Sequence, residues 1–272
     1  MRLQRRCLLL VGAVLWAALL SGCASGRAPA PSPSPEVLQA LAPTGALRVA
    51  VYPGSPTSMV RSAGSDEMRG LSIELGRELA RRLGVPAEIV VLQRVAEVVE
   101  ALKSGRADFT ITNATPARAQ DLDFTPPLLA LELGYLALPG SPVQTLAEVD
   151  RPGVRIGVSQ GSTSQGVLTR DLAQARIVPA PSLQAAGAML QRREIDAFAT
   201  NKAILHELAD SLPGARVLEG RWGLEHLAIA LPRGRGVAAA EYLRGFAESV
   251  RSEGLVGAAA QRAGLRGTVE LR

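Results

Sequence analysis

The strongest constraint on the fold is an alternation of short apolar segments and amphipathic segments that begins at residue 47. Short β-branched runs that lead into turns predict buried strands, and apolar residues at helical spacing predict helices. The segment 70–83 shows helical spacing most clearly, because its leucines recur at every fourth position. The expected order is strand 47–52, helix 70–83, strand 87–92, helix 95–103 and strand 107–112. This β-α-β-α-β order is typical of a parallel α/β sheet.

A second alternation follows Pro152 and predicts a second α/β unit. Its expected elements are strand 154–158, a helix from Gly161 to about Leu172, strand 176–178, helix 183–192 and strand 195–199. Two more apolar segments, 128–138 and 224–231, each end at a proline. We interpret them as extended strands that cross between the two units. A helical stretch follows at 241–263 and is broken near Gly254.

The first 22 residues have the pattern of a secretory signal peptide. Arg2, Arg5 and Arg6 form a positive region, and residues 8–20 form an apolar run that is too short to span a membrane. The Leu-Ser-Gly-Cys sequence that ends at Cys23 resembles a bacterial lipobox. This resemblance implies cleavage before Cys23 and lipid on its sulfur and amine. More than one acyl chain is physically reasonable, because a single chain anchors a protein only marginally. The alternative is an ordinary signal peptide that happens to contain a cysteine near its end.

Cleavage before Cys23 changes the charge and the supply of cysteines. The formal charge is +5 at pH 7, and removal of three arginines with no acidic residue leaves +2. No basic stripe with interleaved aromatic residues is present, so we expect no nucleic-acid partner. Cys7 leaves with the signal peptide and Cys23 carries lipid, so no cysteine remains for a disulfide or a thiolate site. His206 and His226 have no metal-ligand spacing, and we expect neither a metal nor a cofactor.

A spacer is expected between the anchor and the folded part. Residues 24–35 alternate proline with small residues, which favours an extended and solvated chain. We therefore divide the sequence into a signal peptide at 1–22, the lipidated cysteine and spacer at 23–40, the first part of lobe 1 at 41–133, lobe 2 at 134–228, and a return to lobe 1 with a C-terminal helix at 229–272.

Several short motifs occur in a characteristic order over about residues 45–265. They are Leu47-Arg48-Val49, Leu83-Gly84-Val85, the segment 101–108, Thr115-Pro116-Ala117-Arg118, the segment 123–127, Ile156-Gly157-Val158, Gly161-Ser162-Thr163 and Ile195-Asp196-Ala197. In this order they resemble the extracellular solute-binding proteins of the amino-acid type, family 3, which serve ABC importers. The resemblance implies a two-lobed fold like that of periplasmic binding proteins, with two hinge strands and a ligand cleft between α/β lobes.

Arg118 is the first candidate for ligand binding. In the family, the arginine of a Thr-x-x-Arg stretch grips the ligand carboxylate, and a planar guanidinium matches two carboxylate oxygens. We expect Thr115 to cap the short helix that carries Arg118. The alternative is a surface ion pair between Arg118 and Asp121 or Asp123.

The other candidates lie at strand ends and loops near the expected cleft. Ser162 and Thr163 begin a predicted helix whose free N–H groups can hold an anion, and the resemblance implies that they meet the same carboxylate. Thr112 and Asn113 end a strand that faces the cleft. Thr57 lies in the first loop, together with Tyr52, for which a packing role is an equal alternative. Asn201 completes the set of predicted site residues.

Asn201 marks a departure from the family pattern. The resemblance implies an aspartate about five residues after the Asp196-Ala197 pair, where it receives the ammonium group of an amino acid. Here a neutral amide is followed by Lys202. A desolvated ammonium needs an opposite charge. The resemblance implies an amino acid-like solute, whereas this departure favours a carboxylate, dicarboxylate or other small anion over a standard α-amino acid, and both classes stay open.

The expected role is binding without catalysis, as a monomer on the extracytoplasmic face, with an ABC permease of the inner membrane as partner. One alternative is an enzyme on the same scaffold, similar to cyclohexadienyl dehydratase, in which Glu132, Glu207 or Glu225 acts as acid or base. A lytic transglycosylase is not expected, because the sequence ends soon after the second lobe. Another alternative is a ligand sensor without transport. The sequence leaves the choice between inner and outer membrane open.

The lipobox yields a direct test. In the Cys23→Ser variant the sulfur that receives the lipid is lost, so the protein is expected to leave the membrane fraction or to remain uncleaved. Fractionation and gel mobility measure both effects. A variant that fractionates and migrates like the wild type would show that Cys23 is not lipidated.

Overall fold

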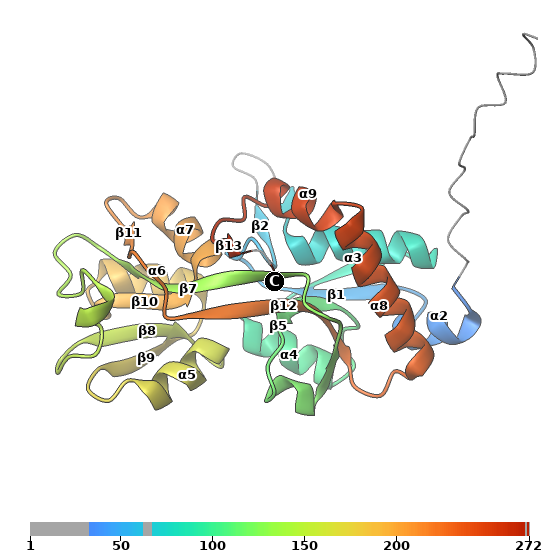
Figure 1. Cartoon of the computed structure of the whole chain (residues 1–272), viewed down its shortest axis with the longest axis horizontal. Helices are drawn as coiled ribbons and strands as arrows, with labels where there is room; N and C mark the ends of the chain where they lie inside the picture. Colours follow the sequence, from blue (N-terminus) through green and yellow to red (C-terminus); the bar gives the residue numbers. More distant parts are fainter. Residues whose placement is uncertain (1–32, 62–66, 270, 272) are drawn as a thin grey trace, which may run out of the picture. The chain divides into compact units, whose positions relative to one another are not determined.

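A computed structural model describes residues 33–61, 67–269 and 271 (Figure 1). The predicted signal peptide and the lipobox at Cys23 lie outside the described residues. Residues 33–269 form one compact unit with two α/β lobes, as predicted from the two alternations. None of the helices in the described part of the chain has the length and apolar character needed to cross a membrane.

Lobe 1 contains the first alternation and the C-terminal helices. Its helices and strands are α2 (Pro35–Leu41), β1 (Leu47–Val51), β2 (Val60–Arg61), β3 (Met68–Arg69), α3 (Leu71–Leu83), β4 (Ala87–Val91), α4 (Val95–Lys103), β5 (Thr110–Asn113), the 3₁₀ turn η1 (Arg118–Gln120), β6 (Leu122–Phe124), α8 (Val237–Ser252) and α9 (Leu255–Arg262). Helices α3, α8 and α9 cover one face of the strands and α4 covers the other (Figure 1).

Lobe 2 contains the second alternation. Its elements are the 3₁₀ turn η2 (Leu146–Glu148), β8 (Arg155–Ser159), α5 (Thr163–Asp171), β9 (Arg176–Ala180), α6 (Leu183–Gln191), β10 (Ala197–Asn201), α7 (Lys202–Ser211) and β11 (Arg216–Val217). Helices α6 and α7 enclose one apolar cluster against the strands, and α5 packs against a second cluster on the other face.

The lobes share two long antiparallel strands, β7 (Leu129–Ala137) and β12 (Gly223–Pro232) (Figure 1). The sheet order β5-β12-β7-β10-β8-β9 places them in the middle, with β5 on one side and β10 on the other. The predicted crossing strands at 128–138 and 224–231 are therefore confirmed. The lobe boundary predicted at 134 lies inside β7, and the one predicted at 229 lies inside β12. Because these two strands belong to both lobes, the boundaries stay predictions. The C-terminal strand β13 (Thr268–Val269) also pairs with β7.

The predicted spacer is too long by six residues. Helix α2 begins at Pro35, Ser34 caps it by accepting a hydrogen bond from the Val37 N–H at 3.3 Å, and Val37 and Leu41 are buried in the core of lobe 1. Proline is well suited to the first position of a helix, since its missing N–H needs no partner there. A proline-rich composition therefore did not exclude a helix start.

Each lobe contains a matching arginine–aspartate pair. In lobe 1 the pair connects β1 with the start of β5, and in lobe 2 it connects β8 with the start of β10. Asp108 accepts hydrogen bonds from the Arg48 backbone N–H, from Arg48 Nε at 2.7 Å and Nη2 at 2.8 Å, and from Arg235 Nη2 at 3.0 Å. Asp196 is held in the same way by the N–H, Nε and Nη2 of Arg155. The two pairs differ in exposure, because the side chain of Arg48 is 17% exposed and that of Arg155 is 37% exposed.

This difference predicts unequal effects on stability. Asp108→Ala leaves Arg48 and Arg235 without their buried partner and is expected to lower the free energy of unfolding by about 3–5 kcal/mol. Asp196→Ala, the matched control in lobe 2, is expected to cost less because water reaches Arg155. Urea denaturation measures both variants. Equal losses would show that burial does not decide the strength of the pairs.

Candidate functional site

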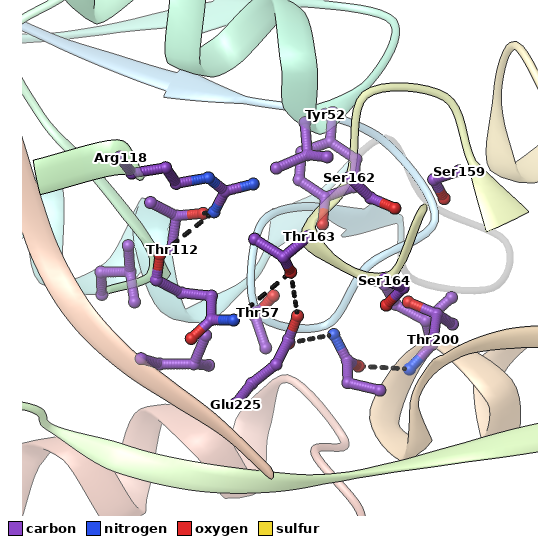
Figure 2. Close-up of a pocket in the computed structure, with 16 residues that line it drawn as sticks. Tyr52, Thr57, Thr112, Arg118, Ser159, Ser162, Thr163, Ser164, Thr200 and Glu225 are labelled. Atoms are coloured by element: carbon purple, nitrogen blue, oxygen red, sulfur yellow. Dashed lines mark hydrogen bonds between the residues drawn. The ribbon is translucent and has the colours of Figure 1, made fainter. Parts of the chain in front are cut away.

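A narrow cavity lies where both lobes meet the shared strands (Figure 2). Its volume is about 30 Å³, which is room for about two water molecules. The residues that line it are Tyr52, Thr57, Val95, Ile111, Thr112, Asn113, Arg118, Ser159, Ser162, Thr163, Ser164, Thr200, Asn201, Ile204, Glu225 and Leu227. Many of them lie at or just after the carboxyl ends of strands β1, β5, β8 and β10, which is where open α/β sheets bind ligands. A solute larger than two waters needs a wider separation of the lobes to enter.

Arg118 points into this cavity from the turn η1 of lobe 1 (Figure 2). Its Nη1 donates to Thr112 Oγ1 at 2.6 Å and to the Asn113 carbonyl oxygen at 3.2 Å, which fixes the direction of the guanidinium. Burial lowers the pKa of Arg118 from its ordinary value, although an arginine remains charged at any physiological pH. Neither Asp121 nor Asp123 forms an ion pair with Arg118. The Asp121 carboxylate pairs with Lys103, and the Asp123 carboxylate accepts a hydrogen bond from the Gly234 N–H. The predicted alternative of a surface ion pair is therefore wrong.

Thr115 has only part of its predicted role. Its Oγ1 accepts the backbone N–H of Arg118 at 3.3 Å, so it positions the turn as expected. The N-cap residue of η1 is Ala117, so Thr115 supports the turn from two positions earlier and does not cap it in the predicted way. Thr115 is half-buried and is not among the residues that line the cavity.

The lobe 2 wall begins at helix α5. Ser162 caps the helix, with its Oγ accepting the Gln165 N–H at 3.1 Å, and Thr163 is the first helical residue. Thr163 Oγ1 accepts a hydrogen bond from Asn113 Nδ2 of lobe 1 at 3.3 Å and donates to Glu225 Oε1 at 3.5 Å. The lobes are thus in direct contact across the cavity, and the structure is a closed one.

Asn201 has a structural task that the sequence analysis missed. Its side-chain oxygen accepts the Ile204 N–H at 3.1 Å and caps α7, while its Nδ2 donates to Glu225 Oε2 at 2.9 Å. The unpredicted helix α7 had a sequence signal, because Ile204, Leu205 and Leu208 recur at helical spacing after a capping asparagine.

Glu225, which the sequence suggested only as a possible acid or base of an enzyme, supplies an acidic side chain to the cavity. It extends from β12 into the cavity and is 8% exposed. Burial raises the pKa of its carboxyl group, and the hydrogen bond from Asn201 and the charge of Arg118 oppose that rise. Tyr52, on the lobe 1 side, has its pKa raised to about 12, chiefly by burial. Within the described residues, no cluster of three or more histidine, cysteine, aspartate or glutamate side chains could hold a metal ion.

Comparisons with known proteins bear on the family and the fold. A family model described as bacterial extracellular solute-binding proteins, family 3, matches residues 47–212. The solute receptor for L-cysteine of Neisseria gonorrhoeae is 23% identical, with 83% of this chain and 92% of that chain covered and a TM-score of 0.74. An amino acid ABC transporter substrate-binding protein from Streptococcus pneumoniae, bound to L-arginine, is 20% identical, with 86% and 99% covered and a TM-score of 0.73.

A third similar structure is an ancestral amino acid-binding protein that is a precursor of cyclohexadienyl dehydratase. It is 20% identical, covers 83% of this chain and 98% of its own, and has a TM-score of 0.71. At these identities the likeness shows the fold alone. No curated protein matches the chain.

The contact between the lobes predicts a sensitive position at Gly161. Its φ is +72°, and a Cβ added there would lie 2.6 Å from the Cβ of Ala96 on α4, across the cavity. Gly161→Ala is therefore expected to oppose closure and to weaken solute binding roughly tenfold or more, which corresponds to about 1.4 kcal/mol. Small-angle scattering should show a less compact protein.

The double variant Gly161→Ala with Ala96→Gly separates the clash from backbone strain at the positive φ. Removing the Ala96 methyl group is expected to restore most of the affinity. If the double variant binds no better than Gly161→Ala, the contact between these residues does not control closure.

Proposed function

Because the chain belongs to the bacterial extracellular solute-binding proteins, family 3, we propose that it is the lipid-anchored binding component of an ABC import system. In this role it captures a small solute that carries a carboxylate and encloses it between the lobes. The single observation that carries this function is Arg118, a half-buried cation that lines the cavity and whose direction is fixed by Thr112 and Asn113.

Arg118 suits a carboxylate for geometric and electrostatic reasons. Nη1 is occupied by lobe 1, whereas the described residues provide no hydrogen-bond partner for Nε and Nη2. Two parallel N–H groups of a guanidinium match the two oxygens of a carboxylate. Thr163 and Ser162 bring hydroxyl groups and the N-terminal end of α5 to the same cavity, which favours negative charge further.

The transport role has support from the family and from the N-terminal sequence. An anchored binding protein keeps the solute near an ABC permease in the inner membrane, and the predicted lipid on Cys23 supplies the anchor on the extracytoplasmic face. Closure of two lobes over the solute gives the permease a shape that differs from the empty form. We propose that the protein works as a monomer, because the cavity takes its lining from both lobes of one chain.

An enzyme on the same scaffold is the second candidate, and Glu225 is the observation that favours it. A buried carboxyl group with a raised pKa can donate a proton to a leaving group beside a carboxylate held by arginine. An enzyme releases a changed product, whereas a binding protein returns its solute unchanged. Mass spectrometry of solutes after incubation with the protein distinguishes the two functions.

Substitution of Arg118 tests the carboxylate contact. Loss of the guanidinium leaves the carboxylate of an enclosed solute unpaired, which costs about 2–5 kcal/mol, or about 30-fold to several-thousand-fold in affinity. Arg118→Ala is expected to show this loss for carboxylate solutes, and Arg118→Lys is expected to recover only part of it, because an ammonium lacks the two-pronged geometry.

Calorimetry measures the affinities, and Arg170→Ala serves as the matched control. Arg170 is exposed near the end of α5 and pairs with Asp171, so its loss is expected to leave affinity unchanged. Full affinity of Arg118→Ala for the best-binding carboxylate would contradict the proposed function.

A further inference from the structure

The cavity contains an acidic group that has no cationic partner in direct contact among the described residues. Glu225 on β12 is almost completely buried, and within the described part of the chain its two oxygens accept hydrogen bonds only from neutral groups, Asn201 and Thr163. Arg118 influences it through space without a direct contact. A buried carboxylate is unfavourable unless a positive charge offsets the lost hydration. The geometry therefore leaves a place for a cation that comes with the solute.

The neighbouring lysine does not fill this place. Lys202 follows Asn201 in the sequence, but its Nζ lies 2.6 Å from Glu132 Oε2 on β7. Arg221 also pairs with Glu132, at 3.1 Å. Residue pairing explains the separation, because Glu225 is opposite Leu131 on β7, whereas Glu132 is opposite Leu224. Adjacent residues of a strand point to opposite faces of the sheet, so Glu132 and its cations lie on the other face from the cavity.

We propose that Glu225 is the counter-charge for a cationic group of the solute and that this contact selects solutes with an amino group in addition to the carboxylate. This selection rests on the proposed carboxylate-binding function. Arg118 and Glu225 then hold the two opposite charges of a zwitterion, with Thr163 between them (Figure 2). The acid that is absent at position 201 is thus supplied from a hinge strand, and Asn201 orients it.

Glu225 also makes binding depend on pH. The groups that face it are Arg118 and Tyr52 from lobe 1, and Thr163 and Asn201 from lobe 2. Burial raises the pKa of Glu225 in the empty site, and an ammonium beside it lowers that pKa again. Binding of an amino-bearing solute therefore releases a proton wherever empty Glu225 is protonated. Affinity is expected to rise with pH through the pKa of the empty site and then to level off.

The experiment compares two matched series of small solutes by calorimetry. One series consists of glycine, L-alanine, L-serine and L-cysteine, and the other consists of acetate, propionate, 3-hydroxypropionate and 3-mercaptopropionate. The wild type is expected to prefer the amino series. Glu225→Gln keeps the size and the hydrogen bonding of the side chain, and it is expected to lose at least about 30-fold for the amino series, equivalent to 2 kcal/mol. Its affinity for the series without amino groups should be retained or increased.

Two controls accompany this comparison. Glu132→Gln removes a carboxylate from the other face of the shared strands and is expected to leave both series unchanged. Titrations in buffers of different ionisation enthalpy measure the released proton, which should be present in the wild type and absent in Glu225→Gln. Thermal unfolding confirms that each variant is folded.

Each result has a defined meaning. Preference of the wild type for the series without amino groups, or full affinity of Glu225→Gln for the amino series, would overturn the role of Glu225. In those cases the carboxylate function stands if Arg118→Ala still loses affinity. Failure of the folded wild type to bind either series would overturn both proposals together.

Discussion

The antiparallel pairing of β7 with β12 is the constraint on which the rest of the structure depends. These two strands belong to both lobes, so each lobe is complete only when both crossings are made. They also bring the site together, because β12 pairs with β5 next to Asn113 and β7 pairs with β10 next to Asn201. A single register error in β12 would move Glu225 to the opposite face of the sheet and place Leu224 or His226 in the cavity.

The stabilising contacts of the lobes are kept apart from the contacts that change with closure. Inside each lobe, an aspartate just before β5 or β10 accepts hydrogen bonds from the guanidinium and the backbone N–H of an arginine on β1 or β8. Between the lobes, the hydrogen bonds across the cavity are long, such as Asn113 with Thr163 at 3.3 Å and Arg94 with the Pro181 carbonyl oxygen at 3.5 Å, and farther from the cavity Arg266 pairs with Asp210 on α7. Most members of each apolar cluster come from one lobe, although Ala203 of α7 joins the core of lobe 1 and Tyr52 packs against the core of lobe 2.

Most of the fold could be predicted from the sequence because its signals are local. Helix 70–83 and the two hinge strands needed only apolar spacing and terminal prolines. Strand 195–199 was placed two residues too early, because Asp196 is held by Arg155 across the lobe and pairing begins at Ala197. The sequence of β12 did contain a signal for Glu225, because Glu225 occupies the same face of the strand as the buried Leu227, Ile229 and Leu231. Its importance depends on which residues lie opposite, and that is a tertiary fact.

The charges of the cavity explain why closure and occupancy should be linked. In the closed structure Glu225 is almost completely buried and Arg118 is half-buried, yet they do not form an ion pair with each other. Loss of hydration is unfavourable for a charged group that has no opposite charge beside it. An empty protein therefore gains free energy by opening, which rehydrates both groups at the cost of weak contacts such as Asn113 with Thr163. A solute that offers opposite charges to both residues reverses this balance, and the closed form then reports that the site is filled.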